Sequence, residues 1–216
     1  MKESRQDFPS ASGIPIKQVY TSEDLAQIDA SREIGLPGEP PYTRGVYPEM
    51  YRRRLWTIRR YSGFGTPEET NQLFKREFEL GQTGFSVAVD APTASGVDSD
   101  HPMAFADVGA CGVSISTIDD MRVIFDGLPI EEAGTSLSVV QMSCLPLTAM
   151  YFAVAQERGI DLKRLSGTTL NDITTALGCL GMSYQTSPKS FIRLAIDLIE
   201  WCSQVAPRWH SVGVDS

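Results

Sequence analysis

Short apolar runs alternate with longer helical segments over the last two thirds of the chain. Runs rich in Val, Ile, Phe, Ser and Thr predict strands at residues 84–90, 112–116, 135–139, 166–171 and 210–214. Apolar residues at helical spacing predict helices at residues 118–125, 145–158, 172–180 and 187–205. Alternation of strands and helices is typical of βα units around a parallel sheet, so an α/β fold is expected.

The first third of the chain carries weaker signals. Ser22, followed by two acidic residues, favours a helix over residues 22–34, and the Gly/Pro-rich residues 35–41 form a loop. A second helix is predicted over residues 66–80, with Thr66 as N-cap and Pro67 in the first turn. We therefore expect an N-terminal arm at residues 1–80 and a barrel-like α/β domain at residues 81–216.

Small side chains recur at every second position of the predicted strands. They are Ser86, Ala88, Ser114, Ser116, Ser136, Ser138, Thr168, Ser211 and Gly213. Ordinary parallel barrels fill their interior with bulky branched residues. One alternative is that these small residues face solvent. We favour an inward orientation, because surrounding helices would bury the apolar residues between them. The interior would then be lined by hydroxyls that suit an extended polar ligand.

Composition narrows the possible functions. The 216 residues are 42% hydrophobic with a formal net charge of −8, which argues against a general nucleic-acid-binding surface. Neither an apolar run long enough for a membrane span nor a secretory signal is apparent. The four cysteines are expected to be reduced core residues of a cytoplasmic protein, and the two histidines lack the spacing of a zinc site.

Residues 42–61 combine six arginines with four tyrosines in an otherwise acidic chain. Guanidinium groups pair with phosphates in a two-pronged geometry, and tyrosines offer ring faces and hydroxyls. This basic-aromatic segment therefore predicts an anion-binding site. The alternative is a solvated basic helix face.

Several motifs, in order, resemble the large subunit of the methylmalonyl-CoA mutase family. They are residues 42–45 (YTRG), 56–59 (WTIR), 61–64 (YSGF), 81–88 (GQTGFSVA), 98–102 (DSDHP), 125–129 (FDGLP), 166–168 (SGT) and 171–173 (NDI). The similarity covers roughly residues 40–216 and is densest before residue 129. The resemblance implies an acyl-CoA held along the axis of a (β/α)₈ barrel, and a separate domain that carries adenosylcobalamin for a radical rearrangement of the carbon skeleton.

The resemblance also implies roles for individual residues. Positions that match the family's substrate contacts are Tyr47, Met50, Arg54, Thr57, Arg59, Ser86, Ser136, Ser138 and Thr168. Tyr61 matches the tyrosine beside the reacting carbons, and Val89 and Cys111 match positions that line the corrin. The matched residues include no metal ligand.

The chain departs from the family in three respects. Leu170 replaces a glutamine that holds the substrate carbonyl, and Leu180 stands where dicarboxylyl mutases have a carboxylate-binding arginine. The chain ends before the family's Gly-Tyr-His motif, and it lacks the Asp-x-His-x-x-Gly signature of a cobalamin domain. Residues 84–216 are also too few for the eight strands and about 250 residues of a full barrel. We therefore expect an incomplete TIM-type (β/α) barrel.

These observations leave three hypotheses. The chain is a component of an adenosylcobalamin-dependent acyl-CoA mutase that acts on an apolar or branched acyl group. Its partner would be a chain with the remaining strands or the cobalamin domain, in a hetero- or homo-oligomer. Alternatively, it is a non-catalytic CoA-binding or structural subunit, or a truncated relic of a mutase. The third hypothesis is an unrelated α/β protein whose arginines only cap helices.

Overall fold

The computed structural model describes residues 8–137, 143–172, 174 and 187–213. It divides into two compact units, Met1–Trp56 and Thr57–Ser216. The predicted helix at 172–180 lies almost wholly outside the described residues. None of the described helices has the length and apolar character needed to cross a membrane.

The first unit contains only short elements. Two-residue strands β1 (Phe8–Pro9) and β2 (Pro15–Ile16) pair antiparallel. A 3₁₀ turn, η1 (Ser22–Leu25), a π turn, η2 (Ala30–Ile34), and a second 3₁₀ turn, η3 (Met50–Arg52), follow.

The continuous helix predicted over residues 22–34 is wrong. Asp29 has extended backbone geometry, and its carboxylate accepts the N–H groups of Ser31 and Arg32, so it starts a new element inside the predicted helix. Neither η1 nor η2 buries a residue. A longer helix would lack the packed face that normally stabilises helices in proteins.

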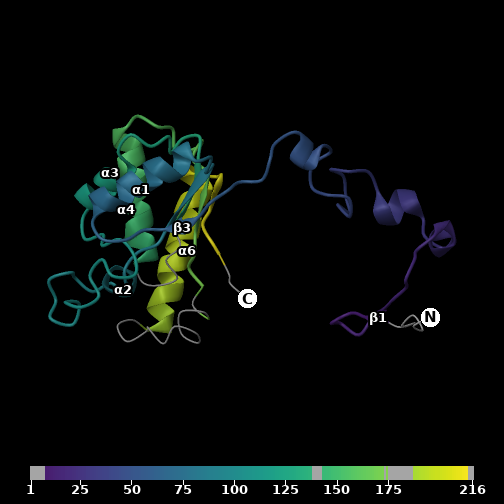
Figure 1. Cartoon of the computed structure of the whole chain (residues 1–216), viewed down its shortest axis with the longest axis horizontal. Helices are drawn as coiled ribbons and strands as arrows, with labels where there is room; N and C mark the ends of the chain where they lie inside the picture. Colours follow the sequence, from purple (N-terminus) through teal and green to yellow (C-terminus); the bar gives the residue numbers. More distant parts are fainter. Residues whose placement is uncertain (1–7, 138–142, 173, 175–186, 214–216) are drawn as a thin grey trace, which may run out of the picture. The chain divides into compact units, whose positions relative to one another are not determined.

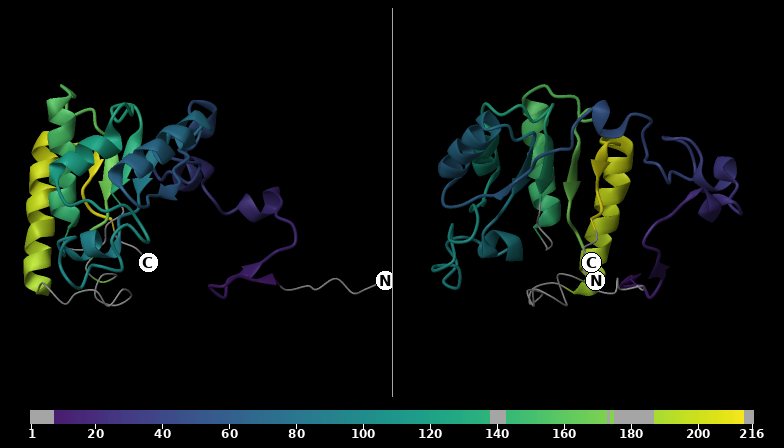
Figure 2. Two further views of the ribbon diagram at one scale, coloured as in Figure 1. Left: turned by 60° about the vertical axis from the view of Figure 1, so that its left-hand side comes forward. Right: turned by 45° about the vertical axis from the view of Figure 1, so that its right-hand side comes forward.

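The second unit is a five-stranded parallel sheet with helices along one face (Figures 1 and 2). Its strands, in spatial and chain order, are β3 (Tyr61–Ser62), β4 (Gly84–Val87), β5 (Gly134–Leu137), β6 (Gly167–Thr169) and β7 (Trp209–His210). The predicted α/β class is confirmed. The sheet is open and does not close on itself, which agrees with an incomplete TIM-type barrel.

The helices follow the same order as the strands. They are α1 (Pro67–Glu79), α3 (Ile118–Phe125), α4 (Cys144–Glu157) and α6 (Pro188–Val205), with a short α2 (Ala91–Ser95) after β4. Each long helix packs against the next, α1 on α3, α3 on α4 and α4 on α6. The predicted bounds of these four helices differ from the observed ones by one residue at most.

Local signals explain why α1 begins where predicted. The Thr66 hydroxyl accepts the N–H of Glu69, and the Glu69 carboxylate accepts the N–H of Thr66 at 2.8 Å. This reciprocal pair satisfies two donors that a helix start leaves without partners. Thr117 and Asp120 form the same arrangement at α3.

The strand predictions need three corrections. Residues 112–116 do not form a strand, β3 was not predicted, and the strand expected at residues 210–214 is instead β7 at Trp209–His210. Beyond Ser62 the chain diverges from β4, and Val113 lies between the two, with single bridges to Gly65 and Val89. Its N–H donates to Ala88 at 2.8 Å and its carbonyl accepts from Asp90 at 3.0 Å. Only Val113 of residues 112–116 forms β-bridges, because this run lies where the two neighbouring strands separate.

The core lies between the sheet and the helices. An aromatic series crosses it, with ring centroids 4.9–6.4 Å apart, and consists of Phe74, Phe85, Phe125, Tyr151, Phe152 and Trp209. Hydroxyls within it pair with one another: Tyr151 donates to Thr135 at 2.9 Å, and Thr148 and Thr169 lie 2.9 Å apart. These hydroxyls can remain buried in the core because each of them has a hydrogen-bond partner there.

The cysteine prediction holds only in part. Cys144 and Cys202 are buried and free, and burial raises the pKa of each thiol to about 11. Cys111 is exposed, so its assignment to the core was wrong, because it lies in the turn-rich segment before Gly112. Cys179 lies outside the described residues.

Glu77 of α1 holds β3 in place. Its buried carboxylate accepts the Ser62 hydroxyl at 2.9 Å and lies 3.6 Å from the Arg60 guanidinium. These contacts fix the residues on both sides of Tyr61. We expect Glu77→Gln to lower the free energy of unfolding by about 1 kcal/mol, because the buried group that accepts from Ser62 and faces Arg60 loses its negative charge.

Urea denaturation would measure this change, with Glu79→Gln as the control, because Glu79 is exposed on the same helix. Equal stability of the two variants would contradict a structural role for Glu77.

Candidate functional site

One row of side chains crosses the sheet. The strand register pairs Tyr61 with Ser86, Ser86 with Ser136, Ser136 with Thr168, and Thr168 with His210. Paired residues of parallel strands project from the same face. The structure therefore brings four of the predicted site residues together in a single polar row and adds His210 to it.

The opposite face carries the residues that the helices bury. Those are Ser62, Phe85, Val87, Thr135, Leu137, Thr169 and Trp209. The predicted orientation is thus confirmed for Ser86, Ser136 and Thr168, which alternate with these core residues.

Exposure varies along the row. Ser86 and Ser136 are each 9% exposed, Thr168 is half-buried, and Tyr61 and His210 at the two ends are exposed. Partial burial raises the pKa of the Tyr61 phenol above its usual value. The phenol therefore stays protonated at neutral pH and can donate a hydrogen bond.

A glycine pair lies two residues before the serines. Gly84 and Gly134 are register partners and, by alternation, share the face of the row. A Cβ on Gly84 would lie 2.7 Å from the Arg59 Cγ, so the Arg59 stem occupies the space that the glycine leaves. The arrangement places a guanidinium-bearing side chain on the sheet face that carries the hydroxyls.

Thr57 lies on the same extended segment as Arg59. The neighbouring Ile58 donates its N–H to the Thr83 hydroxyl at 2.8 Å and accepts the Thr83 N–H at 2.9 Å. This pairing holds the segment beside β4. Thr57 and Arg59 both remain exposed.

The other predicted residues of the basic-aromatic segment belong to the first unit. Tyr47 is 62% exposed, Arg54 is exposed, and Met50 is half-buried with its side chain beside Gly45. They share a unit with each other and not with the row. Ser138 lies outside the described residues.

Asn171 fixes the chain beyond the other end of the row. Its amide donates to the Ser211 carbonyl at 2.8 Å and accepts the Gly213 N–H at 3.3 Å. Leu170, half-buried, fills the space beside Gly213, where a Cβ would lie 2.3 Å from the leucine Cδ2. By strand alternation, Leu170 lies on the same face as Thr168. The face of the row therefore carries an apolar side chain next to the Thr168 hydroxyl.

The two predicted cofactor positions differ in exposure. Val89 is 8% exposed and belongs to the hydrophobic core, whereas Cys111 is exposed. Their assignment to the corrin remains a prediction. Among the described residues no group of three His, Cys, Asp or Glu side chains is arranged to hold a metal ion.

Sequence reasoning missed His210 as a site residue. The available signal was strand alternation, since the buried Trp209 places the next residue on the opposite face. The structural contacts of Glu77 and Asn171 join residues 15 and 40 positions apart, and no local pattern indicates them.

Comparison with known proteins identifies the family. The methylmalonyl-CoA mutase sequence profile matches residues 9–216. A probable mitochondrial methylmalonyl-CoA mutase of Caenorhabditis elegans is 41% identical over 94% of this chain, and the methylmalonyl-CoA mutase large subunit of Streptomyces virginiae is 40% identical over 98%. The 2-hydroxyisobutanoyl-CoA mutase large subunit of Aquincola tertiaricarbonis is 38% identical over 98%.

This chain spans 27%, 28% and 37% of the length of these three relatives, respectively. The profile match, together with the polar row on an open parallel sheet, leads to one conclusion: the chain belongs to the methylmalonyl-CoA mutase family.

Proposed function

We propose that this chain forms part of the acyl-CoA-binding wall of a mutase that rearranges the carbon skeleton of an acyl group. The observation that carries the proposal is the register of Tyr61, Ser86, Ser136, Thr168 and His210 on one sheet face. The names of the relatives, all CoA-ester mutases, support the reaction class.

Each group in the row has a role that its chemistry suits. The hydroxyls of Ser86, Ser136 and Thr168 both donate and accept, as the amides of a pantetheine arm require. Arg59 provides a guanidinium for a CoA phosphate. Tyr61 lies at the exposed end of the row, where its protonated phenol can contact the acyl group.

We also propose substrate contacts for Tyr47, Met50 and Arg54 of the first unit and for Thr57 of the second. Arg54 offers a guanidinium, and the other three offer contacts to the substrate. Their assignment rests on the matched family motifs and on the exposure of Tyr47, Arg54 and Thr57.

We propose an apolar or branched acyl group as the substrate class. Leu170 presents a hydrocarbon side chain beside Gly213, at the position where the family has a glutamine that holds the substrate carbonyl. Leu180, the second apolar replacement, lies outside the described residues.

We propose that adenosylcobalamin, if used, is bound by a region outside this chain. The family's cofactor would supply the radical that starts the rearrangement. The residues present here would bind and orient the acyl-CoA. We propose a partner that holds the cofactor or the remaining strands, which the large-subunit names of two relatives support. Three free thiols among the described residues support a reducing compartment such as the cytoplasm.

A second candidate function is a non-catalytic CoA-binding subunit. Leu170 favours it, because a position that touches the substrate carbonyl in the family has lost its polar group here. In that case the row would still bind CoA, and turnover would depend on another chain.

Replacement of the two central serines tests the binding role. We expect Ser86→Ala combined with Ser136→Ala to weaken binding of CoA roughly tenfold, because two hydrogen bonds of about 0.5–1.5 kcal/mol each are lost. Binding of adenosine 3′,5′-bisphosphate, which lacks the pantetheine arm, should stay unchanged. Isothermal titration calorimetry measures both ligands.

Ser203→Ala serves as the control, since Ser203 is exposed on α6 and bonds only within its own helix. Absence of CoA binding by the unmodified chain and its partner complex would refute the proposed function.

Tyr61→Phe separates the two candidate functions. We expect it to lower turnover at least tenfold if the row faces the reacting carbons, because the phenol loses its hydroxyl. The assay uses the chain together with its neighbouring gene products, adenosylcobalamin and isobutyryl-CoA. Tyr20→Phe in the first unit is the control. Unchanged turnover of the Tyr61→Phe complex would favour the non-catalytic subunit.

His210 is expected to contact the acyl-CoA at the other end of the row. His210→Leu should weaken isobutyryl-CoA binding about fivefold or more without changing adenosine 3′,5′-bisphosphate binding, and His210→Asn, which keeps a donor, should restore part of it. His101→Leu is the matched control, because that exposed imidazole only accepts the Met103 N–H. Identical affinities for the His210→Leu and unmodified chains would argue against this contact.

A further inference from the structure

Residues 58–64, which lead into β3 and out of it, are held at every second position by side chains from outside the segment. Ile58 donates its N–H to the Thr83 hydroxyl at 2.8 Å. Arg60 donates its N–H to the Gln82 Oε1 at 3.0 Å. Both contacts use a side-chain oxygen where a regular parallel ladder would use a backbone carbonyl.

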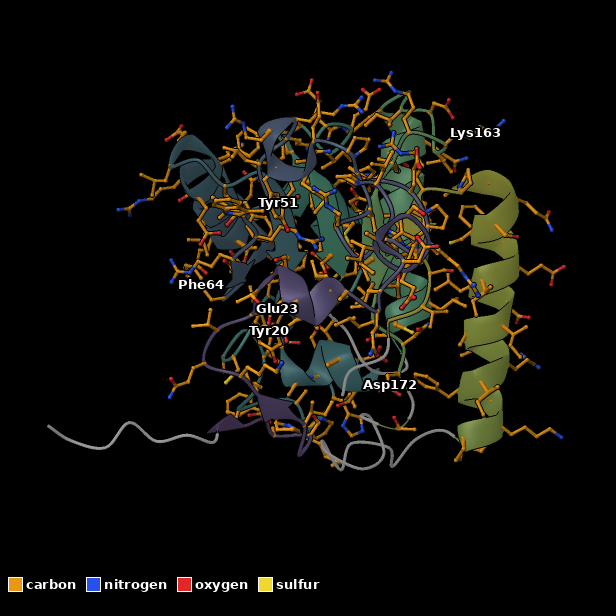
Figure 3. All side chains as sticks on the ribbon, turned by 90° about the vertical axis from the view of Figure 1, so that its right-hand side faces the viewer. Tyr20, Glu23, Tyr51, Phe64, Lys163 and Asp172 are labelled. Carbon is orange, nitrogen blue, oxygen red and sulfur yellow. The ribbon has the colours of Figure 1, made fainter. Side chains whose placement is uncertain are left out.

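The next two even-numbered residues are held by helix α1. Ser62 donates its hydroxyl to the buried Glu77 carboxylate at 2.9 Å. Phe64, labelled in Figure 3, donates its N–H to the Thr70 hydroxyl at 3.1 Å, and its carbonyl accepts from that hydroxyl at 2.8 Å. The four contacts therefore tie one side of the segment to residues 70–83.

The odd-numbered residues of the same stretch have side chains that take no part in these contacts. Thr57, Arg59 and Tyr61 are all exposed. The Arg60 guanidinium lies 3.6 Å from the Glu77 carboxylate, whereas the ion pairs of the described residues do not include Arg59. The segment thus separates residues that anchor the chain from residues whose side chains are available to a ligand.

Gln82 and Thr83 hold the residues on both sides of Arg59. The next residue, Gly84, leaves room for the Arg59 stem, because a Cβ there would lie 2.7 Å from the Arg59 Cγ. Residues 82–84 therefore fix the backbone around Arg59 and make space for its side chain. A long side chain loses less conformational freedom on binding when its backbone and first carbons are already fixed.

The Gln82 amide has a feature that stability alone does not explain. Its side chain is buried, and its Nε2 has no hydrogen-bond partner among the described residues. The bond from the Arg60 N–H to Oε1 sets the orientation of the amide, so a rotation that exchanged Nε2 and Oε1 would lose that bond. A buried donor without a partner lowers stability. Proteins keep such groups mainly where function requires them.

We propose that Gln82 and Thr83 are positioning residues for Arg59, which they hold where its guanidinium meets a phosphate group of the ligand. They act through the backbone N–H groups of Ile58 and Arg60 and do not contact the ligand themselves. This inference deepens the proposed function and rests on it for the identity of the ligand.

Variants that remove each acceptor test this role. The probe is adenosine 3′,5′-bisphosphate, and isothermal titration calorimetry measures its affinity for the full chain, alone and in its partner complex. We expect Gln82→Met and Thr83→Val each to weaken binding about fivefold, because Arg59 gains freedom that binding must remove again. Thr83→Ser, which keeps the hydroxyl acceptor, should bind like the unmodified chain.

Urea denaturation checks that the Gln82 variant keeps its fold. Gln82→Met removes the acceptor of the Arg60 N–H, but it also removes the buried donor without a partner. We therefore expect its stability to stay close to that of the unmodified chain while its affinity falls.

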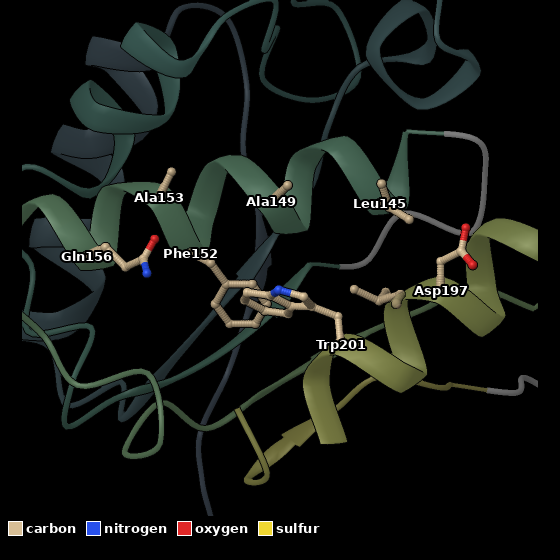
Figure 4. A pocket seen from close by; sticks show the side chains of 8 residues that line it. Leu145, Ala149, Phe152, Ala153, Gln156, Asp197 and Trp201 are labelled. Atoms are coloured by element: carbon tan, nitrogen blue, oxygen red, sulfur yellow. The ribbon is translucent and has the colours of Figure 1, made fainter. Parts of the chain in front are cut away.

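Arg59→Ala supplies the readout that a purely structural role would not change. In a chain that already carries Arg59→Ala, Gln82→Met and Thr83→Val should weaken binding no further. Gln156→Met is the matched control and should leave binding unchanged, because Gln156 is exposed and lines a cavity of about 330 Å³ between α4 and α6 (Figure 4). Equal losses with and without the Arg59 side chain, or unchanged affinity of both single variants, overturn the proposal.

Amide hydrogen exchange of the chain without ligand separates failure of this proposal from failure of the proposed function. The amides of Ile58 and Arg60 should exchange at least about tenfold more slowly than in an unfolded chain, and Gln82→Met should remove the protection of Arg60 alone. Absence of this protection overturns the proposal even if CoA binds. If the protection is present but the unmodified chain binds neither CoA nor the bisphosphate, the proposed function fails and the arrangement of Gln82 and Thr83 stands.

Discussion

The in-register pairing of five parallel strands is the constraint on which both faces of this molecule depend. Because side chains alternate between faces, one register decides at once which residues reach the helices and which line the open side. Neighbouring strands lie about 4.8 Å apart, so the row presents a hydrogen-bonding group at each such step. A slip of one residue would move Phe85 and Trp209 onto the open face and the hydroxyls into the core.

Contacts outside the strands hold the two ends of this row. Glu77 reaches from α1 to Ser62, next to Tyr61, and Asn171 reaches from β6 to the segment after His210. The central strands need no such support, because neighbouring strands and the helix layer bury them. Ligand contacts are proposed at the two exposed ends of the row. The position of each end therefore depends on one buried polar side chain.

The same sheet also leaves an end unfinished. In the described residues the helix layer stops at α6 and the sheet stops at β7. At this end of the row the side chain of Leu170 is apolar, whereas the side chains of the row itself are polar. Leu170 lies beside Gly213, in the segment that follows His210.

The amino-acid sequence by itself determined the α/β class, the four long helices and the orientation of Ser86, Ser136 and Thr168 opposite to the core residues. These features depend on short-range patterns: the Thr66 and Thr117 caps lie within a few residues of their partners, and strand alternation has a period of two. Only the tertiary structure decided that Val113 alone of residues 112–116 forms β-bridges, that residues 61–62 form β3, and that His210 joins the row. Each of these three features depends on which distant segment of the chain lies beside the residues concerned. The hydrogen bonds that fix them join residues far apart in the chain, and local sequence patterns do not indicate such pairs.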